Sequence, residues 1–500
     1  MTYHTILENL KKTYIPADIK LFEKAYDFAK AAHAGQKRKS GDDYITHSLA
    51  VANYLGNHLH MDIDTLVAGL LHDVPEDTTV PLAEIKKTFG KEIAFMVEGI
   101  TKLGKIKLRN QKDETYIETL RKMFFSMAAD IRVVLIKLAD RLHNLQTLSF
   151  LPPEKQERIA RETLEVYAPI ADRLGMGELK GELEDLSFIY AYPKEHEWLR
   201  EQGEVRFEQM REYIERTKKT VQKELKEAGI KTNGIHGRAK HRYSLYQKLL
   251  RARYGRDINK IYDLVALRII TPTLENCYAT LGVLHSKYKP LPGRIKDYIA
   301  FPKPNGYRSI HTTVFGPEGR IMEVQIRTPE MHSEAEYGIA AHWAYTERGK
   351  PDWGYKVPEQ LEWVRELRDW QKDIGGNPDD FMEALHIDFF KNRIFIFTPR
   401  GDVKDLPEGA TALDMAFAVH TGLGLHAQGA KINGKMGKLA DELENGDVVE
   451  IIKAHQINVS RDWVNIAKTS SARSKIKSYL KDHSRGWGFL PEFRFMNRKK

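Results

Sequence analysis

The spacing of hydrophobic and polar positions changes along the chain, and these changes predict its architecture. Apolar residues recur at helical spacing in the first part, as at Leu66, Leu70 and Leu71. Strict alternation appears in the middle, in the segments 306–315 and 321–327. Short β-like segments around one helix return in the last third. We therefore predict a multidomain α+β protein with an all-helical domain, a mixed-sheet domain and a small β-grasp domain.

Turn and cap residues predict where the first helices begin and end. One helix is predicted over 21–34, where Gly35 ends it. Thr46 is expected to cap a second helix, with His47 in its first turn.

The stretch HDVPED at 72–77 follows a third helix, which Asp62 or Asp64 can cap. Because Pro75 disfavours helix at the residue before it, this helix should end at the first two residues of the stretch. Four of the six residues can bind a metal or move a proton, and an adjacent His-Asp pair suits no core. A polar helix end with a solvated acidic turn is the alternative.

A helix over 131–148 is predicted to be buried on both faces. One face is an apolar stripe, and the other turns polar halfway along, at Asp140 and Asn144. A buried polar group without a partner costs about 1–3 kcal/mol, so Asp140 needs one. A bound cation is one candidate, and Arg141 or Arg132 is the other.

The first part of the chain therefore offers a ligand set for a divalent first-row metal: His47, His72, Asp73 and Asp140. Such a metal lowers the pKa of a bound water and polarises a phosphoryl oxygen. Glu76 and Asp77 lie one turn beyond the His-Asp pair and are candidates to position or deprotonate that water.

The middle part begins with a charged helix over 198–228, typical of a solvated support. A dense basic cluster between 237 and 256 then leads into a strand over 261–270, interrupted by Asp263. This arrangement predicts a phosphate channel that ends at a carboxylate suited to Mg²⁺. A solvated or nucleic-acid-facing helix is the alternative for the basic cluster.

A hairpin follows, with its apolar residues on one face. A half-exposed sheet is one explanation of the alternation, but the residue types on the other face favour a binding surface. These residues are Tyr307, Ser309, His311, Thr313, Glu323, Gln325 and Arg327.

The last third begins with a predicted helical linker over 349–376. A hairpin entry at 393–402, a helix over 412–420 and strands at 430–434 and 448–452 then indicate a β-grasp module. A basic tail follows.

Composition adds three limits. The formal net charge of +9 suggests phosphate-bearing partners. The single cysteine, Cys277, excludes an internal disulfide framework and a Cys-based zinc site, and suits a reducing cytosol. The first residues lack the apolar run of a signal peptide, and no apolar stretch approaches the ~20 residues of a membrane span. We therefore expect a cytoplasmic protein.

The spacing of the four metal-ligand candidates resembles the HD phosphohydrolase superfamily. With the phrases RKSG (38–41), HDVPED (72–77) and KLADRLHNLQT (137–147), the first part is similar to the RelA/SpoT family of (p)ppGpp synthetase/hydrolases. The resemblance implies that the four ligands hold Mn²⁺, and that Glu76 and Asp77 act on the 3′-pyrophosphate of (p)ppGpp. It implies four residues around the nucleotide: Arg38, Lys39, Asn144 and Thr147.

The middle part is similar to the synthetase domain of the same family, in the phrases GRAKHRYSLYQK (237–248), RIKDYIAFPKPNGYRSIHTTVFGPEG (294–319) and EVQIRT (323–328). The implied reaction moves the β,γ-pyrophosphate of ATP to the 3′-hydroxyl of GDP or GTP. Asp263 and Glu323 would hold Mg²⁺, and Glu323 would also activate the 3′-hydroxyl. The implied nucleotide contacts, with Tyr307 stacked on the guanine, are Arg238, Lys240, Ser244, Lys248, Arg294, Lys296, Lys303, Asn305, Tyr307, His311 and Gln325.

The phrase RIKD (294–297) matches the pattern of bifunctional family members, as does the intact HD set. We therefore expect both activities, with antagonistic coupling through the helices between about 170 and 235. Two alternatives are a regulatory RNA- or ribosome-binding protein with vestigial sites, and a hydrolase of other nucleotides.

The segment 394–424 resembles a TGS domain, which in this family is implicated in contacting uncharged tRNA and thereby the ribosome. His420 is the candidate contact, with helix packing as the alternative. Full-length members continue into further regulatory domains, including an ACT domain, so a natural or a truncated end at residue 500 stays open. The predicted parts are an HD hydrolase domain (1–195), a nucleotidyltransferase-like synthetase domain (196–345), a helical linker (346–388), a TGS domain (389–453) and a basic helical tail (454–500).

Overall fold

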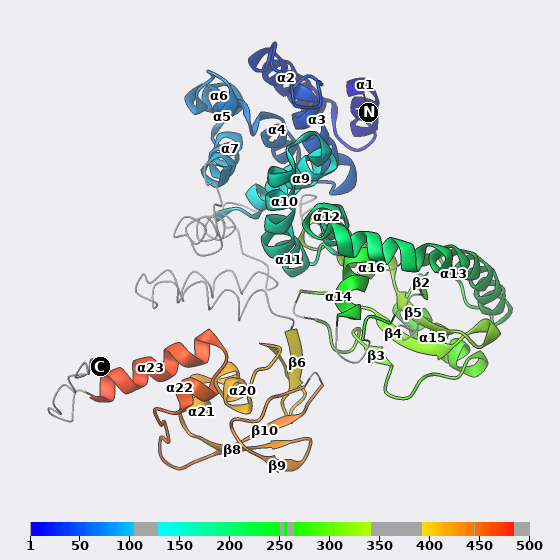
Figure 1. Ribbon diagram of the computed structural model, residues 1–500, viewed down its shortest axis with the longest axis vertical. Helices are drawn as coiled ribbons and strands as arrows, with labels where there is room; N and C mark the ends of the chain where they lie inside the picture. The colour runs from blue at the N-terminus through cyan, green and yellow to red at the C-terminus, as the bar shows by residue number, and fades with distance from the viewer. Residues whose placement is uncertain are drawn as a thin grey trace, which may run out of the picture. The chain divides into compact units, whose positions relative to one another are not determined.

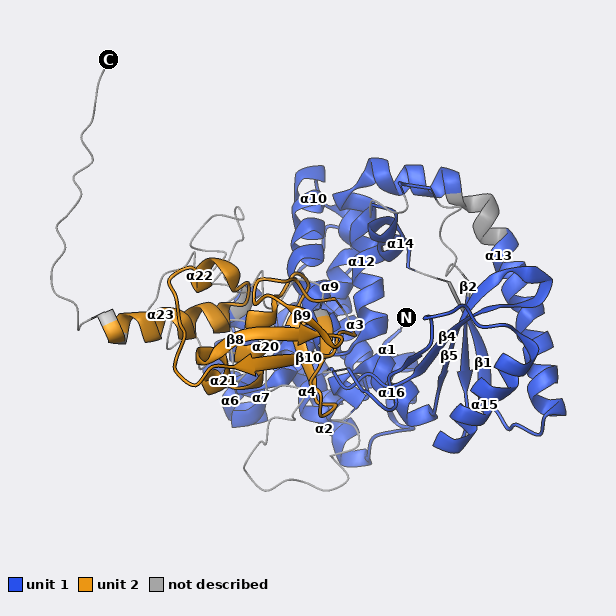
Figure 2. Cartoon of the chain, turned by 90° about the horizontal axis from the view of Figure 1, so that it is seen from below, with its two compact units in different colours: residues 1–368 blue, residues 369–500 orange. Residues whose placement is uncertain are grey.

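The computed structural model describes residues 2–104, 129–239, 241–250, 255–257, 265–303, 305–341, 393–444 and 446–484. The chain divides into two compact units, Met1–Arg368 and Asp369–Lys500 (Figure 2). The domain limits expected from the sequence are a finer division and stay predictions. The expected linker helix over 349–376 lies outside the described residues.

The first half of unit 1 is helical (Figure 1). Two π-helical turns, Tyr54–His58 and Thr163–Tyr167, and a 3₁₀ turn, Leu148–Phe150, lie between its α-helices. The α-helices are α1 (Tyr3–Leu10), α2 (Pro16–Ala32), α3 (Ile45–Asn53), α4 (Ile63–Leu71), α5 (Val74–Asp77), α6 (Leu82–Phe89), α7 (Lys91–Gly104), α9 (Ile131–Gln146), α10 (Pro153–Glu162), α11 (Ala168–Arg173) and α12 (Gly177–Ala191).

The caps of α4 and α5 follow the expected pattern. Asp62 caps α4, since its Oδ1 accepts a hydrogen bond from the Thr65 N–H at 2.8 Å. Helix α4 ends just before His72, and Pro75 stands in the first turn of α5. The chain therefore turns at the His-Asp pair, as predicted.

The start of α3 differs from the prediction. Tyr44 already has helical backbone angles, so the helix begins at Ile45 and Thr46 falls inside its first turn. The Thr46 hydroxyl donates to the Asp43 carbonyl at 2.7 Å and does not cap. The predicted Thr46 cap is wrong, although His47 does lie in the first turn.

Helix α9 is buried on both faces, as its sequence predicts. Leu135 and Leu138 on one face and Ile136 on the other are fully buried, and Asp140 is only 4% exposed. The helix packs against α3, α7 and α12. It therefore crosses the middle of the helical half and carries its polar residues inward.

Helix α13 (Pro193–Glu227) leads to a five-stranded sheet (Figure 1). The strand order is β1-β2-β5-β4-β3, and the sheet is mixed because β2 and β5 are parallel while the other neighbours are antiparallel. Residues 261–264, the start of the predicted strand, lie outside the described part. The strands and helices are β1 (Gly234–Ala239), α14 (Arg242–Leu249), β2 (Val265–Ile270), α15 (Leu274–Lys287), β3 (Lys296–Asp297), β4 (Ile310–Phe315), β5 (Ile321–Arg327) and α16 (Pro329–Tyr337).

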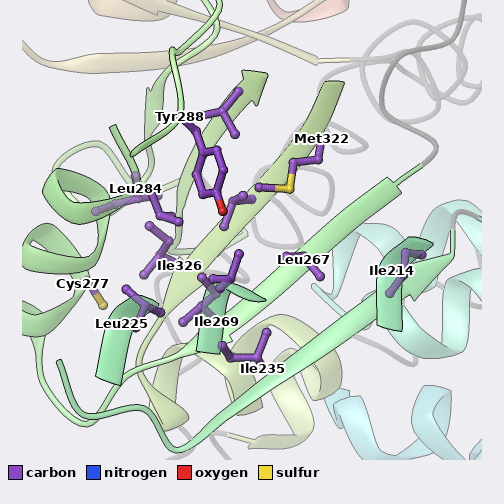
Figure 3. Close-up of a cluster of buried hydrophobic side chains, with 14 of the residues drawn as sticks. Ile214, Leu225, Ile235, Leu267, Ile269, Cys277, Leu284, Tyr288, Met322 and Ile326 are labelled. Atoms are coloured by element: carbon purple, nitrogen blue, oxygen red, sulfur yellow. The ribbon is translucent and has the colours of Figure 1, made fainter. Parts of the chain in front are cut away.

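One face of this sheet is an apolar core. Met322, Val324 and Ile326 of β5 are fully buried and belong to one cluster with Leu267 and Ile269 of β2. Figure 3 shows the cluster, to which α13 and α15 also contribute. The predicted alternation is confirmed in β5, where it directs Glu323, Gln325 and Arg327 to the opposite face, whereas the strand expected over 306–315 begins only at Ile310.

Unit 2 has short strands around helix α20 (Ala412–Val419), as predicted from the sequence, and these strands form two small sheets. The hairpin of β6 (Arg393–Phe397) and β7 (Val403–Pro407) forms one sheet. The other has the order β10-β8-β9, with β8 (Ala427–Ile432), β9 (Lys435–Gly437) and β10 (Val449–Lys453). The three-residue β9 was missed because so short a strand shows no periodicity. The helices are α20 (Ala412–Val419), α21 (Thr421–Leu425), α22 (Trp463–Ile466) and α23 (Ser470–Ser484).

A buried carboxylate fastens the segment before α23 to α20. Asp414 is 1% exposed and completes a capping box with Thr411. Its oxygens also accept hydrogen bonds from the Lys468 and Thr469 backbone N–H groups at 2.8–3.1 Å and from the Thr469 hydroxyl at 2.8 Å. The first part of the predicted basic tail is thus helical and docked.

Among the helices that the structure describes, none combines the length and the apolar character needed to cross a membrane.

Candidate active sites

The four predicted metal ligands meet where α3, the α4–α5 turn and α9 converge. Nε2 of His47 lies 3.2 Å from Oδ1 of Asp140 and 3.5 Å from Oδ2 of Asp73. Nε2 of His72 lies 3.1 Å from Oδ1 of Asp73 and 3.9 Å from Oδ1 of Asp140. Residues far apart in the sequence thus direct two imidazoles and two carboxylates at one point.

The chemistry of this cluster fits a divalent metal. His72 is 1% exposed, and its Nδ1 lies 2.8 Å from the Gly69 carbonyl, to which it donates. In the neutral ring Nε2 therefore carries the lone pair, and this buried atom makes no hydrogen bond among the described residues, although Asp73 Oδ1 lies 3.1 Å away. A buried lone pair facing two carboxylates needs a cation, and a carbonyl on the far ring nitrogen is the usual support of a metal-bound His.

The electrostatics favour the same conclusion. Burial lowers the pKa of His47 despite its carboxylate neighbours, so the ring stays neutral and suited to bind metal. Burial would also lower the pKa of His72, but Asp73 and Asp140 raise it to about 9. Burial opposes charge on Asp140, yet Lys137 and His47 hold its pKa well below the usual value. Without a metal, the two carboxylates therefore favour a proton on His72, and a bound cation would take the place of that proton.

Asp140 has side-chain partners that the sequence analysis did not name. Lys137 Nζ and Asn144 Nδ2 each lie 2.6 Å from one of its oxygens. Lys137 is one turn before Asp140, and that spacing was the signal for it. The arginine alternatives are wrong, because each bonds at 2.7 Å to another carboxylate: Arg132 to Asp130 and Arg141 to Glu162.

A cavity of about 480 Å³ opens beside the cluster. Asp140 lines it, together with all four residues expected around the hydrolase nucleotide: Arg38, Lys39, Asn144 and Thr147. The Arg38 Nη2 also donates to Asn144 Oδ1 at 2.8 Å. Sequence reasoning missed further lining residues, among them the basic Arg158 and the apolar Phe150.

The acidic turn α5 is tied to the metal cluster. Glu76 and Asp77 are both exposed, and the Tyr44 hydroxyl lies 2.5 Å from Oδ2 of Asp77 and 3.0 Å from Oδ2 of Asp73. The alternative of a polar helix end with a solvated acidic turn is therefore incomplete, because the turn is exposed but also bonded to the metal cluster through Tyr44. Tyr44 was not identified as a site residue, because nothing local in the sequence shows that its hydroxyl reaches 29 and 33 residues ahead.

His143 is a second missed residue. Its Nδ1 lies 2.8 Å from the Nδ1 of His47, and the two rings are 4.9 Å apart. This contact occupies the far nitrogen of His47 and orients its Nε2 towards the carboxylates.

The polar face of the sheet carries a connected chain of side chains. His311 Nδ1 lies 3.1 Å from Glu323 Oε1, which also accepts from Gln325 Nε2 at 3.0 Å. The Tyr307 hydroxyl lies 2.7 Å from His311 Nε2. Burial lowers the pKa of His311 even beside Glu323, so its ring is neutral. Four predicted synthetase residues are thus joined around one carboxylate.

Lys303 lies over this chain of contacts. Its Nζ is 4.9 Å from the ring centroids of both Tyr298 and Tyr307, and burial lowers its pKa. The ring of Tyr307 meets that of His311 edge-on. Tyr298 was not singled out from the sequence.

Strand register links other predicted residues to Glu323. Glu323 pairs with Ala266 of β2, which pairs with Arg238 of β1, so the three positions share one row across the sheet. Lys296 pairs with His311. The Arg238 side chain, Lys240 and Asp263 lie outside the described residues.

The remaining candidates are spread out. Arg294 is exposed in the turn before β3, and Lys248 lies in the last turn of α14. Asn305 Nδ2 donates weakly to the Asp172 carbonyl at 3.4 Å, and the Ser244 hydroxyl donates to Glu184 at 3.0 Å. These last two contacts are with the helical half of unit 1, not with Glu323.

In unit 2, His420 is exposed and stands at the start of α21, where its Nδ1 accepts from the Gly422 N–H at 3.0 Å. The helix-packing alternative is wrong, because the side chain caps a helix and is not packed in a core.

Known proteins match all three parts of the chain. A family model described as an HD domain matches residues 25–177, a region found in RelA / SpoT proteins matches 237–350, and a TGS domain matches 394–453.

Three curated relatives match nearly the whole chain. A GTP pyrophosphokinase of Myxococcus xanthus is 46% identical over 470 residues, which are 94% of this chain and 61% of the relative. A guanosine-3′,5′-bis(diphosphate) 3′-pyrophosphohydrolase of Aquifex aeolicus and the bifunctional (p)ppGpp synthase/hydrolase SpoT of Escherichia coli are each 44% identical, covering 96% of this chain and 67% of the relative. The chain thus spans about three fifths to two thirds of the length of these relatives.

The fold and these matches define a class of protein that joins an HD domain, a mixed-sheet domain of the RelA/SpoT type and a TGS domain in one chain. With these relatives, the chain belongs to the RelA/SpoT family.

Proposed function

We propose that the chain both makes and destroys (p)ppGpp. It would transfer pyrophosphate from ATP to the 3′-hydroxyl of GDP or GTP, and hydrolyse (p)ppGpp to GDP or GTP and pyrophosphate. The observation that carries the hydrolase is the 480 Å³ cavity, in which four expected nucleotide contacts line the same space as the metal-ligand candidate Asp140. Its substrates are cytoplasmic nucleotides, which supports a cytoplasmic location.

In the hydrolase, the four metal-ligand candidates would hold Mn²⁺, which supplies Lewis-acid activation of water and of a phosphoryl oxygen. Glu76 and Asp77 take the proton from the attacking water and fix its direction. Arg38 and Lys39 neutralise phosphate charge at the cavity wall, and Asn144 and Thr147 supply polar contacts. The water oxygen bonds to the phosphorus attached to the 3′-oxygen, and that oxygen leaves with the nucleoside.

In the synthetase, Asp263 and Glu323 would hold Mg²⁺, which neutralises the triphosphate. Glu323 takes the proton of the 3′-hydroxyl, whose oxygen bonds to the β-phosphorus of ATP while AMP leaves. Tyr307 stacks on the guanine, with Lys303 beside it. The phosphates of ATP are bound by the basic side chains along β1 and α14: Arg238, Lys240 and Lys248. The other expected contacts are Ser244, Arg294, Lys296, Asn305, His311 and Gln325.

Running both reactions at once would waste ATP, so we infer that the two sites are coupled antagonistically. Contacts of α12 with the start of α14 support this inference. Asp185 accepts from His241 Nδ1 and from the Tyr243 N–H, each at 3.0 Å, and Glu184 accepts from Ser244 at 3.0 Å. Carboxylates of the hydrolase half therefore hold the start of α14, and Glu184 occupies the hydroxyl of Ser244, which is one of the expected nucleotide contacts. Simultaneous binding of hydrolase and synthetase ligands without mutual effect would contradict the coupling.

The TGS module would contact uncharged tRNA, and through it the ribosome, with His420 as a candidate contact. Its exposure supports this role.

Product analysis of the purified protein tests the proposal. One tube holds ATP, GDP and Mg²⁺, and the other holds ppGpp and Mn²⁺, each with a chelator-treated control. We expect AMP and ppGpp in the first tube and GDP and pyrophosphate in the second. If neither tube yields product, a binding protein with vestigial sites is favoured.

A further inference from the structure

Tyr44 forms the bridge between the metal cluster and the acidic turn. Its hydroxyl lies 2.5 Å from Oδ2 of Asp77 and 3.0 Å from Oδ2 of Asp73. A hydroxyl has one proton to donate, and the shorter separation assigns it to Asp77.

The ring of Tyr44 is fixed from three sides. His33 stacks on it with centroids 4.6 Å apart and an interplanar angle of 13°. The Arg38 guanidinium lies 5.8 Å from the ring centroid, and His47 meets the ring edge-on at 6.2 Å. A phenol ring held in this way keeps its hydroxyl in one position. A side chain that contacts a metal ligand from outside the coordination sphere fixes the orientation of that ligand in the same manner.

A second bond holds Asp77 from its backbone. Gln36 Nε2 donates to the Asp77 carbonyl at 2.7 Å, and Gln36 Oε1 lies 2.8 Å from Nδ1 of the buried His33. His33, Gln36, Asp77 and Tyr44 thus close a ring of contacts. Asp77 is exposed on a helix of only four residues, so without this ring its carboxylate would be free to rotate.

We infer that Tyr44 is a positioning residue of the hydrolase: it holds the Asp77 carboxylate beside the metal ligand Asp73, so that Asp77 faces the attacking water. The inference rests on the proposed hydrolase function. Tyr44 itself does not contact the substrate. His33 and Gln36 hold Tyr44 and Asp77 in fixed positions relative to each other.

Tyr44→Phe is the decisive variant, because it keeps the stacked ring and removes only the hydroxyl. We expect kcat for ppGpp hydrolysis to fall by about 10-fold or more, with KM changed by less than about threefold. Binding of Mn²⁺ to the metal-free protein, followed by electron paramagnetic resonance, should keep its Kd. Gln36→Met should lower kcat in the same direction but less.

Tyr14→Phe is the matched control. The Tyr14 hydroxyl donates to the Met61 carbonyl at 2.6 Å in the same half of the unit. A wild-type protein without hydrolase activity would mean that the proposed function itself fails. If wild type is active but Tyr44→Phe keeps its kcat, or loses Mn²⁺ affinity in proportion to kcat, Tyr44 does not act through Asp77 and the inference is wrong.

Discussion

Asp185→Ala tests the coupling between the two halves of unit 1. Helix α14 has no side-chain cap of its own, and Asp185 of α12 accepts the Tyr243 N–H in its first turn at 3.0 Å. The second oxygen accepts from His241 at 3.0 Å. The imidazole packs so closely on α12 that a Cβ at Gly181 would lie 2.2 Å from its Nε2. The variant therefore removes the carboxylate and leaves the packing.

The size of the effect follows from these contacts. Loss of a helix cap costs about 0.5–2 kcal/mol, and loss of one further hydrogen bond costs about 1 kcal/mol. Because the Asp185 side chain is 32% exposed, water replaces part of the lost cap and part of the lost hydrogen bond. We expect the two lost contacts together to weaken the attachment of α14 to α12 by about 1–2 kcal/mol, which corresponds to a factor of about 5–30 in an equilibrium constant.

The assay is synthetase kcat/KM for ATP. If the carboxylate holds α14 away from ATP, kcat/KM should rise up to that factor in Asp185→Ala, and inhibition by a hydrolase-site ligand should weaken equally. Glu197→Ala is the control, since Glu197 pairs with Arg200 on the exposed side of α13. An unchanged kcat/KM, or a fall, would refute the reasoning.

Three further predictions concern stability. Mn²⁺ at 100 times its Kd should stabilise the protein by about 2.7 kcal/mol in thermal unfolding, and Asp73→Ala should abolish the shift; an equal shift in that variant would place the metal elsewhere. Asp414→Ala should destabilise unit 2 by about 3 kcal/mol or more, since it removes the acceptor of the buried Thr469 N–H and of the partly buried Lys468 N–H; unchanged hydrogen exchange at these amides would contradict this. Burial and Arg327 lower the pKa of His332 to about 4, so the unfolded state takes up a proton first as the pH falls below about 6.5. The urea midpoint should therefore fall between pH 7 and pH 5, and fall less in His332→Gln; an equal fall in both would exclude His332 as the cause.

The features that the sequence predicted best are local ones. The two apolar faces of α9, the Asp62 cap and the alternation of β5 each depend on neighbours in the chain, and the structure has all three. The metal-ligand candidates were identified from the adjacent His-Asp pair at a helix end and from a buried Asp on α9, and the structure brings them together.

What the sequence could not supply was long-range. The contacts of Tyr44 with Asp77 and of His143 with His47 span 33 and 96 residues, and no local pattern encodes them. The contact of Asp185 with His241 depends on how α12 packs against α14. The Thr46 cap failed for a different reason: the backbone is already helical at Tyr44, two residues before Thr46.

The central claim is that one chain carries two separate active sites. The most direct test measures both reactions in wild type, Asp73→Ala and Glu323→Gln, with thermal unfolding as a check on folding. The account predicts that wild type performs both, that Asp73→Ala keeps only synthesis, and that Glu323→Gln keeps only hydrolysis. If either substitution abolished both reactions in a folded protein, or neither reaction depended on its assigned carboxylate, the two-site account would be contradicted.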